Sequence, residues 1–498
     1  MINKFLSVVI LIFLHCSANG QTTYSNLYKL GFGNDNLIKS FIEISDTIYV
    51  STGDICYSTG SSCSTLSSFN KNGELIKSLN NEFLQAGNEN NIELLDDKFV
   101  VSCHPSHPNR LSSDFIFFDK NLSDSEAYTT FADSSYRYFN EGIIFHQENY
   151  YTYGNGGIVA NDSIIGYIIK WDERLESHKK VLIYNELDQE NMIDDLQINS
   201  QGNLVYINQG ESSTINKDVS LFTTIDTAGK ILNRFEFSKS QNENHRNFVL
   251  TNNDDYVYVA SFPNVWTESL LCFDSEDFSE KWVLEMPFQQ LDETYRSYDI
   301  YDLSRANNGD ILGCGEVFMP VADLGKYHTG FIFRLDAITG ELLWIRYYLV
   351  PNKINQSEGE LFHDSFLRVI KELDNGDIQV AGRVEQDDGS LERKLWLLRT
   401  DANGCLDNNC GEENIISNTE DFNYNNSVVN IYPNPSNGIV HIESEKTIQH
   451  IMVIDIIGRI IEVHLNNKIN LFHLNSGFYT ITLQMKDGTI TSKKLHLF

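Results

Sequence analysis

The sequence predicts an all-β protein, a seven-bladed β-propeller followed by a small immunoglobulin-like β-sandwich. Apolar residues alternate or occur in short runs between pairs such as Asn-Gly and Asp-Gly, which is typical of strands joined by tight turns. A hairpin unit recurs seven times at intervals of roughly 50 residues. A further set of short strands follows at the C-terminus, where the charge balance of the chain changes.

Each repeat contains a short apolar strand that ends at an Asp or Asn, then a turn and a second strand. The clearest copy is Phe331–Asp336 with the turn Ala-Ile-Thr-Gly340. A further strand precedes each unit, often after a turn such as Asn-Asn-Gly309. The aligned acidic or amide residues are Asn70, Asp119, Asp172, Asp226, Asp274, Asp336 and Asp401. Seven two-hairpin modules of this length fit the four-stranded blades of a propeller.

The last repeat lacks its outermost strand, because it runs directly into Cys405. The alternating segment Thr22–Leu30 could supply this strand from the other end of the chain. Such a pairing would join the first and last blades, which would otherwise present unpaired strand edges. We therefore expect the N-terminal segment to close the ring.

One repeat resembles a known propeller motif. The segment Leu335–Trp344, Leu-Asp-Ala-Ile-Thr-Gly-Glu-Leu-Leu-Trp, resembles the tryptophan-docking repeat of the quinoprotein-like propeller superfamily. The resemblance implies that Asp336 and Gly340 make the turn and that Trp344 packs between neighbouring blades. Lys281-Trp282 repeats this tryptophan in one other blade. The resemblance supports the fold, and no cofactor site is assigned from it.

Residues 1–20 are interpreted as an export signal. Lys4 precedes the apolar run Phe5–Leu14, and small residues precede Gln21, where we expect cleavage. The apolar run is too short to span a bilayer, and no later segment is apolar enough to do so. The sequence therefore predicts no membrane span and a destination in which disulfides are allowed.

Three ordered motifs near the C-terminus carry a closer resemblance. They are Ile431-Tyr-Pro-Asn-Pro-Ser-Asn-Gly438, Val453-Ile-Asp-Ile-Ile-Gly-Arg459 and Gly477-Phe-Tyr-Thr480, with Lys493-Lys494 after them. This segment resembles the type A C-terminal sorting domain of the type IX secretion system of Bacteroidota. The residues that carry the motif are Pro433, Asn434, Pro435, Gly438, Gly458, Gly477 and Tyr479.

The resemblance implies Sec export to the periplasm, handling by the type IX secretion machinery, and delivery to the medium or the outer cell surface. The two prolines fix φ and lack a backbone donor, so the chain is expected to turn there. The predicted organisation is a signal peptide at 1–20, the propeller at 22–410, a polar linker at 411–427 and the sorting domain at 428–498.

The chain is strongly acidic, with 37 Lys and Arg against 69 Asp and Glu and a net charge of −32. Its field repels phosphate backbones and anionic lipids, so nucleic acid is not expected as a partner. An acidic shell that keeps an exported protein soluble explains this charge. Weak collective attraction of Ca²⁺ is the alternative.

Seven cysteines remain once the signal is removed. Two close pairs, Cys56 with Cys63 and Cys405 with Cys410, are candidate disulfides that would staple short loops. The odd total leaves at least one free thiol, and the candidates are cysteines on buried strands, namely Cys272 and Cys314.

No metal, cofactor or catalytic residues are assigned from the sequence. Cys103-His-Pro-Ser-His-Pro108 groups a thiol and two imidazoles, but its spacing matches no zinc or haem attachment pattern and suits an ordinary loop. Asp374-Asn-Gly-Asp377 resembles a fragment of a calcium loop, and a hairpin turn explains it better. Serine-hydrolase elbows, paired zinc histidines and phosphate-binding glycine loops are all missing.

We therefore expect a non-catalytic exported propeller that binds an unknown protein or glycan ligand through one face of the ring. The alternative is a secreted enzyme on the same scaffold, quinoprotein-like or polysaccharide-degrading. A quinoprotein requires a cofactor funnel with cation ligands. A polysaccharide-degrading enzyme requires clustered carboxylates or a His/Tyr pair in one cleft.

Overall fold

The computed structural model describes most of the propeller strands, their tight turns and the C-terminal strands, and all structural statements below refer to these residues. The described residues are 23–30, 37–55, 62–81, 84–87, 90–104, 113–130, 136–158, 164–184, 189–212, 217–237, 247–261, 268–286, 290–291, 294–295, 297–321, 325–350, 364–385, 393–406, 410, 413–415, 420–423, 429–444, 447–454, 460–464, 467–485 and 490–498. The expected export signal lies outside them. They contain no helix capable of crossing a bilayer.

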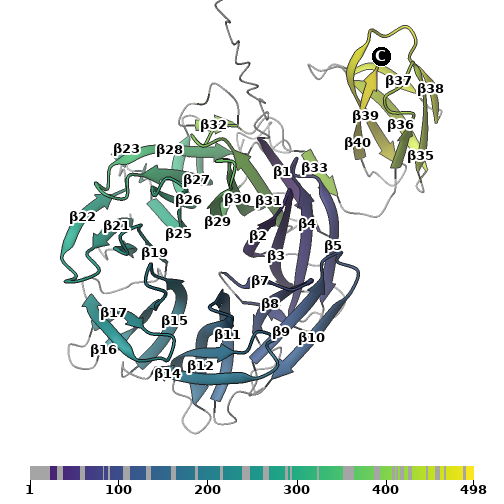
Figure 1. Cartoon of the computed structure of the whole chain (residues 1–498). Coiled ribbons are helices and arrows are strands. Elements are labelled where there is room, and N and C mark those ends of the chain that lie inside the picture. Colours follow the sequence, from purple (N-terminus) through teal and green to yellow (C-terminus); the bar gives the residue numbers. More distant parts are fainter. Residues whose placement is uncertain are drawn as a thin grey trace, which may run out of the picture.

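Seven antiparallel sheets are arranged in a ring, as Figure 1 shows, and each sheet is one blade. Blade 1 contains β2 (Leu37–Ile44), β3 (Thr47–Ile55), β4 (Ser62–Asn70) and β5 (Leu75–Asn81). Blade 2 contains β6 (Gln85–Ala86), β7 (Ile92–Leu95), β8 (Lys98–His104), β9 (Ser113–Asp119) and β10 (Ser125–Thr130). Blade 3 contains β11 (Tyr136–His146), β12 (Asn149–Ile158), β13 (Ile164–Trp171) and β14 (His178–Tyr184).

The remaining blades repeat this order from the middle of the ring outwards. Blade 4 contains β15 (Gln189–Ile198), β16 (Leu204–Ser212), β17 (Lys217–Ile225) and β18 (Ile231–Phe237). Blade 5 contains β19 (Phe248–Leu250), β20 (Tyr256–Ser261), β21 (Glu268–Phe273) and β22 (Glu280–Glu285). Blade 6 contains β25 (Ser297–Arg305), β26 (Ile311–Val321), β27 (Gly325–Leu335) and β28 (Leu342–Leu349), after the small hairpin β23 (Gln290–Leu291) and β24 (Thr294–Tyr295). The predicted seven-bladed propeller is confirmed.

Blade 7 is completed by the opposite end of the chain. It contains β29 (Ser365–Glu372), β30 (Ile378–Glu385) and β31 (Arg393–Thr400), and β1 (Tyr24–Lys29) pairs antiparallel with β31 as the outermost strand. Side chains reinforce this pairing, because Trp396 Nε1 donates to Ser25 Oγ at 2.9 Å and Tyr24 Oη donates to Gln379 Oε1 at 2.8 Å. The expected closure of the ring by the N-terminal segment is confirmed.

The polar segment 411–427 is more than a connector, because it contains two short strands. β32 (Glu413–Ile415) pairs in parallel with β28 of blade 6, and β33 (Glu420–Asn423) pairs in parallel with β1. The closing strand β1 therefore lies between β31 and β33 and has partners on both edges. The sequence did not predict these strands, because the segment is polar and lacks the alternation typical of a half-buried strand.

The recurring Asp or Asn residues cap the turn between the third and fourth strand of each blade. The side chain of Asp226, for example, accepts hydrogen bonds from the backbone N–H groups of Ala228 and Lys230 at 2.9 and 2.8 Å. The equivalent bonds occur at Asn70, Asp119, Asp172, Asp274, Asp336 and Asp401. These side chains satisfy turn donors that no strand partner reaches. The backbone N–H of Thr339 is the main reason that the pKa of the Asp336 carboxyl lies below its usual value.

The turns also receive the outermost strand of the preceding blade. Trp282 of blade 5 covers Gly340 in the turn of blade 6, and its Nε1 donates to Ala337 O at 3.1 Å. Trp344 of blade 6 covers Gly404 in blade 7 in the same way. At the closure, Tyr24 covers Gly73 of blade 1. The expected packing of the tryptophans between blades is therefore confirmed.

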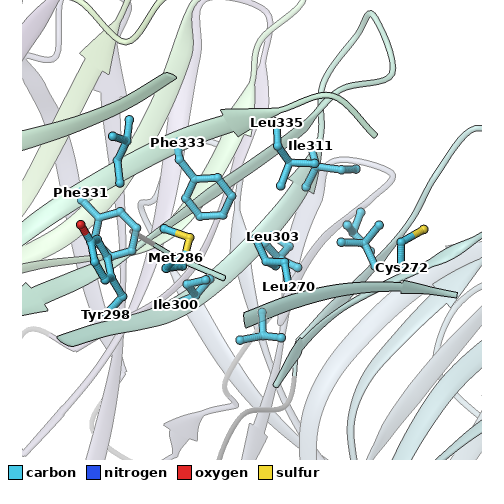
Figure 2. Packing of buried hydrophobic residues seen from close by; sticks show 14 of the residues in the cluster. Leu270, Cys272, Met286, Tyr298, Ile300, Leu303, Ile311, Phe331, Phe333 and Leu335 are labelled. Carbon is cyan, nitrogen blue, oxygen red and sulfur yellow. The ribbon is translucent and has the colours of Figure 1, made fainter. Parts of the chain in front are cut away.

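Seven hydrophobic clusters fill the seven interfaces between neighbouring blades. Figure 2 shows the cluster between blades 5 and 6, in which Leu270 and Cys272 face Ile300, Leu303 and other side chains of blade 6. The cluster at the closure combines Tyr28 and Leu30 with residues of blades 7 and 1. Burial of apolar area in these interfaces is the main stabilising term of the ring.

The C-terminal strands form two sheets around a separate hydrophobic core. One sheet has the order β34-β35-β38 and the other β37-β36-β39-β40. The strands are β34 (Val429–Tyr432), β35 (Ile439–Ser444), β36 (Ile448–Ile454), β37 (Ile460–His464), β38 (Lys468–Asn470), β39 (Gly477–Met485) and β40 (Ile490–Leu497). This arrangement confirms the predicted small β-sandwich.

The contact between a turn glycine and the preceding blade yields a stability prediction. Gly340→Ala should lower the free energy of unfolding by about 2–4 kcal/mol, because a Cβ at φ +72° is strained and would lie 2.5 Å from the Trp282 ring. Gly376→Ala is the matched control, since Gly376 has φ +85° but no atom within 4 Å of such a Cβ. Its loss should be about 1 kcal/mol. Equal losses in equilibrium denaturant unfolding would contradict the docking account.

Candidate functional site

A β-bulge interrupts the innermost strand at the same place in five blades. The bulges lie between Ile38 and Ser40, Asn140 and Gly142, Ile193 and Leu196, Ile300 and Asp302, and Leu367 and Val369. In blade 2 the longer insertion 87–91 separates β6 from β7 at the same place. Bulges redirect side chains and are common near functional sites. We name this set of positions the bulge ring.

In three of the five bulged blades a glycine on the second strand lies opposite the bulge. These glycines are Gly154, Gly315 and Gly382, in blades 3, 6 and 7. A Cβ at any of them would collide with a backbone carbonyl of the innermost strand. The missing side chain therefore permits the close backbone approach that the bulge requires.

The bulge ring carries different chemistry in each blade. The inserted residues are Lys39, Glu141, Asp194 with Asp195, Tyr301 and Arg368. On the second strand, the position directly after the residue opposite the bulge also varies. In blades 1 to 7 this position is Gly53, His104, Asn155, Gln209, Ser261, Glu316 and Arg383. The opposite end of the repeat keeps the same Asp or Asn in all seven blades. The capping residue of the turn is therefore retained in every blade, whereas the side chains at the bulge positions are not, and the fold does not require a particular side chain at the bulges.

Two carboxylates next to the bulges of blades 4 and 6 have raised pKa values, namely Asp195, which is buried, and Asp302, which is partly exposed. Asp195 of blade 4 accepts a hydrogen bond from Asn90 of blade 2 at 3.5 Å, although these blades are not neighbours. Burial raises the pKa of Asp195 to about 6. Burial, with the nearby charge of Asp195, raises the pKa of Asp302 to about 8. The backbone N–H of Ile370 in blade 7 donates to Asp302 Oδ2 at 2.8 Å and opposes this rise, as does the charge of Arg368.

A mixed polar and aromatic cluster lies between blades 6 and 7. Tyr301 Oη donates to Glu316 Oε1 at 2.8 Å, and His328 Nδ1 lies 3.7 Å from Glu316 Oε2. The hydrogen-bonding interaction with Glu316 raises the pKa of His328. Burial and the Glu316 charge raise the pKa of Tyr301, so its phenol remains a hydrogen-bond donor. Asp364 of blade 7 accepts the backbone N–H of His328 at 3.1 Å.

Aromatic rings and a guanidinium complete this cluster. Arg368 Cζ lies 5.8 Å from the centroid of the Tyr301 ring, and the Phe366 ring lies 5.7 Å from it. The Phe318 ring lies 5.0 Å from the ring of His328. We name Tyr301, Glu316, Phe318, His328, Phe366 and Arg368 the blade 6–7 site.

A smaller polar group lies between blades 2 and 3. Glu141 in the bulge of blade 3 lies 3.3 Å from His104 Nε2 and accepts a hydrogen bond from Asn155 at 3.3 Å. His104 belongs to the Cys-His-Pro-Ser-His motif, but the adjacent Cys103 is fully buried and its Sγ donates to Val101 O. His107 lies outside the described residues. Within those residues there is no group of three or more side chains suited to a metal.

The cysteines divide into bonded and free. A disulfide joins Cys405 to Cys410 across a Cα–Cα distance of 5.4 Å, directly after blade 7. Cys63 is also disulfide-bonded, whereas Cys56 lies outside the described residues. Cys103, Cys272 and Cys314 are free and buried in the blade interfaces.

The motif residues of the C-terminal sandwich hold the ends of its sheets together. Pro433, Asn434 and Pro435 connect β34 to β35, and Asn434 Oδ1 accepts the backbone N–H of His496 at 3.0 Å. Ser436 N donates to His496 O at 2.8 Å, so this turn is attached to the last strand. The turn between β34 and β35 therefore contacts the last strand, β40.

The remaining motif positions serve turns and strand starts. Gly438 has φ +123°, and a Cβ there would collide with the Phe472 ring. Gly477 begins β39, and Tyr479 Oη donates to Asn475 O at 2.8 Å. Gly458 lies outside the described residues. Packing against Phe472 therefore explains Gly438, and the hydrogen bond to His496 explains Asn434.

The raised pKa values of Asp195 and Asp302 yield a pH prediction. In the folded chain Asp302 and Asp195 retain protons at pH values where the unfolded chain has lost them, so their contribution to stability falls as pH rises from about 4 to about 8. Asp302→Asn cannot ionise. Its free energy of unfolding should therefore gain on the wild type by an amount on the order of 2 kcal/mol between pH 5 and pH 8. A constant difference across this range in denaturant titrations would contradict the assignment.

Comparison with known proteins identifies a family for the C-terminal sandwich only. Residues 430–496 match the family model described as a secretion system C-terminal sorting domain. No curated protein matches the chain.

Three solved structures resemble the chain at low identity. PorZ, an essential bacterial surface component of the type-IX secretion system of Porphyromonas gingivalis, is 11% identical with a TM-score of 0.37, over 95% of this chain and 70% of that one. The β-propeller domain of the Trilobed protease from Pyrococcus furiosus is 10% identical with a TM-score of 0.41, over 74% and 96%. Sqt1 from Chaetomium thermophilum is 9% identical with a TM-score of 0.40, over 77% and 99%. Such values carry no information about ligand or chemistry.

The sandwich therefore has the fold, the motif residues and the family match that the sequence predicts for it. Residues 430–496 are a secretion system C-terminal sorting domain, which directs this chain through the type IX secretion system to the cell surface or the medium.

Proposed function

We propose that the chain is an exported propeller that binds a protein or glycan ligand without transforming it, through the bulge ring. The observation that carries this proposal is the division of the repeat. One end has a capping Asp or Asn in every blade, and the other end has a different residue in every blade at the second-strand position beside the bulge. A ring needs its repeated contacts for stability, whereas a specific ligand needs an asymmetric set of groups.

The polar groups of the bulge ring also support binding. Tyr301, Glu316 and Arg368 are partly exposed although they lie between two blades. Polar groups that converge between elements and remain accessible are typical of binding sites. The tight-turn end differs, since its Asp and Asn side chains are already used by turn donors.

The sorting domain determines the export route that we propose for the chain. We propose that the signal at 1–20 is removed on export and that the type IX machinery is the partner of residues 428–498. The propeller at 22–410 is then the part that acts outside the cell. The segment 411–427 connects the two, and its strands β32 and β33 attach it to blades 6 and 7.

A secreted polysaccharide-degrading enzyme is the second candidate, and one observation favours it. Glu316 interacts with both the phenol of Tyr301 and the imidazole of His328, which are groups able to exchange protons with a substrate. A binding site and a catalytic site would respond differently to Glu316→Gln. A catalytic Glu316 would lose turnover while retaining the ligand, whereas a binding Glu316 would lose the ligand itself.

The proposal is tested by retention of extracellular material on the immobilised chain. Cell-envelope extract and culture medium of the producing organism would be passed over the wild type and two double variants. Glu316→Gln with Arg368→Gln changes two partly exposed residues of the bulge ring, and Glu276→Gln with Glu341→Gln changes exposed residues of the tight turns. We expect the bulge-ring variant to retain at least about tenfold less material than the wild type, and the turn variant to retain the same amount.

Circular dichroism and thermal unfolding would show that both variants are folded. Protease treatment of the retained material would separate protein from glycan ligands. Retention that is lost in the turn variant, or that survives in the bulge-ring variant, would contradict the proposal. Absence of any retained material would also contradict it.

A further inference from the structure

We propose that the blade 6–7 site binds a neutral saccharide. This inference rests on the proposed function and assigns the chemical class of its ligand. Saccharides present hydroxyl groups that both donate and accept hydrogen bonds, next to apolar C–H faces. A site for them needs acceptors, donors and an aromatic ring within a few ångströms.

The acceptors come from blade 6. The Glu316 carboxylate receives one hydrogen bond from Tyr301 Oη and lies beside His328. A carboxylate has about four acceptor positions, so Glu316 retains capacity for ligand hydroxyls. The Tyr301 oxygen keeps its own lone pairs for a further donor.

The donor comes from blade 7. Arg368 Nε is buried and has no acceptor among the described residues, although its guanidinium lies beside the Tyr301 ring. A buried N–H without an acceptor costs about 1–3 kcal/mol. Arg368 as a whole is partly exposed, so its guanidinium, which has five N–H groups, can donate to a ligand hydroxyl placed against Tyr301.

The rings provide surfaces for the apolar face of a sugar. Tyr301 and Phe318 are both partly exposed, whereas Phe366 beneath them is buried. Phe366 packs edge to face against Tyr301 and holds its orientation. An ordered, partly exposed ring costs little conformational entropy when it receives a ligand.

The charges at this site favour an uncharged ligand. Glu316, Asp299 and Asp364 are acidic, and Arg368 opposes them on the other blade. A uronic acid, a sulfated sugar or a phosphorylated ligand would place its anion next to three carboxylates. A cationic peptide would be attracted by these carboxylates, but Arg368 and the protonated form of His328, whose pKa is raised, oppose this attraction. A neutral saccharide avoids the anionic penalty and uses the acceptors, the donor and the rings together.

A glycan array and titration calorimetry test this inference on the full secreted chain. The array would carry neutral, uronic acid and sulfated oligosaccharides, and the strongest ligand would then be titrated into the wild type and variants. We expect neutral oligosaccharides to bind, and Glu316→Gln and Arg368→Gln each to weaken binding by about tenfold or more. Glu341→Gln is the matched control, since Glu341 is an exposed carboxylate in the tight turn of the same blade, and its affinity should equal that of the wild type.

If Glu316→Gln fails to fold, His328→Ala provides the same test from a side chain that is 43% exposed. Preference for uronic or sulfated sugars, no binding on the array, or unchanged affinity in the blade 6–7 variants would overturn the inference. Failure of the saccharide inference can be distinguished from failure of the proposed binding function. Retention of protease-sensitive material that depends on the bulge ring, together with a silent array, would support ligand binding and reject the saccharide.

Discussion

The contact between the outermost strand of one blade and the tight turn of the next is the interaction on which the structure depends. Trp282 makes this contact between blades 5 and 6, and Trp344 makes it between blades 6 and 7. Tyr24 makes it between blades 7 and 1, where the ring closes. Closure is special because β1 comes from the opposite end of the chain and supplies both a strand and an aromatic side chain. The parallel strand β33 on its other edge leaves β1 with no open edge along the register the two share. The two ends of the propeller sequence therefore stabilise one another.

This construction separates the positions that the ring requires from the positions that vary between blades. The turn end keeps an Asp or Asn in every blade, because this side chain caps the turn, and several turns also receive the preceding blade. The bulge end has no such constraint beyond the small residues that permit the bulge. Charged and aromatic side chains such as Glu141, Tyr301 and Arg368 therefore differ between blades without loss of the ring. A propeller can acquire a new ligand at this end while its turns remain unchanged.

Much of the architecture can be predicted from the sequence, because turns and strands are marked by local residue patterns. The Asp or Asn that ends each third strand marks a turn wherever it occurs, and Thr22–Leu30 alternates as a strand should. The bulge end of the repeat cannot be recognised from local sequence in this way. A bulge shifts the register by one residue, and the signal for it is a glycine before a polar residue on the next strand, as in Gly315-Glu316 and Gly382-Arg383. The meeting of Tyr301 with Arg368 depends on how two blades pack, which no local pattern encodes. The strands β32 and β33 were missed because their pairing, rather than their composition, makes them strands.

Hydrogen–deuterium exchange of the backbone amides tests the central claim most directly. If β1 closes the ring, the amides of Tyr24–Lys29 should exchange as slowly as those of β13, an internal strand with antiparallel partners on both sides. Both segments should then lose protection in a single cooperative transition as denaturant is added. Rapid exchange in β1 while β13 remains protected would show that the ring is stable without its closing strand, and would contradict this account.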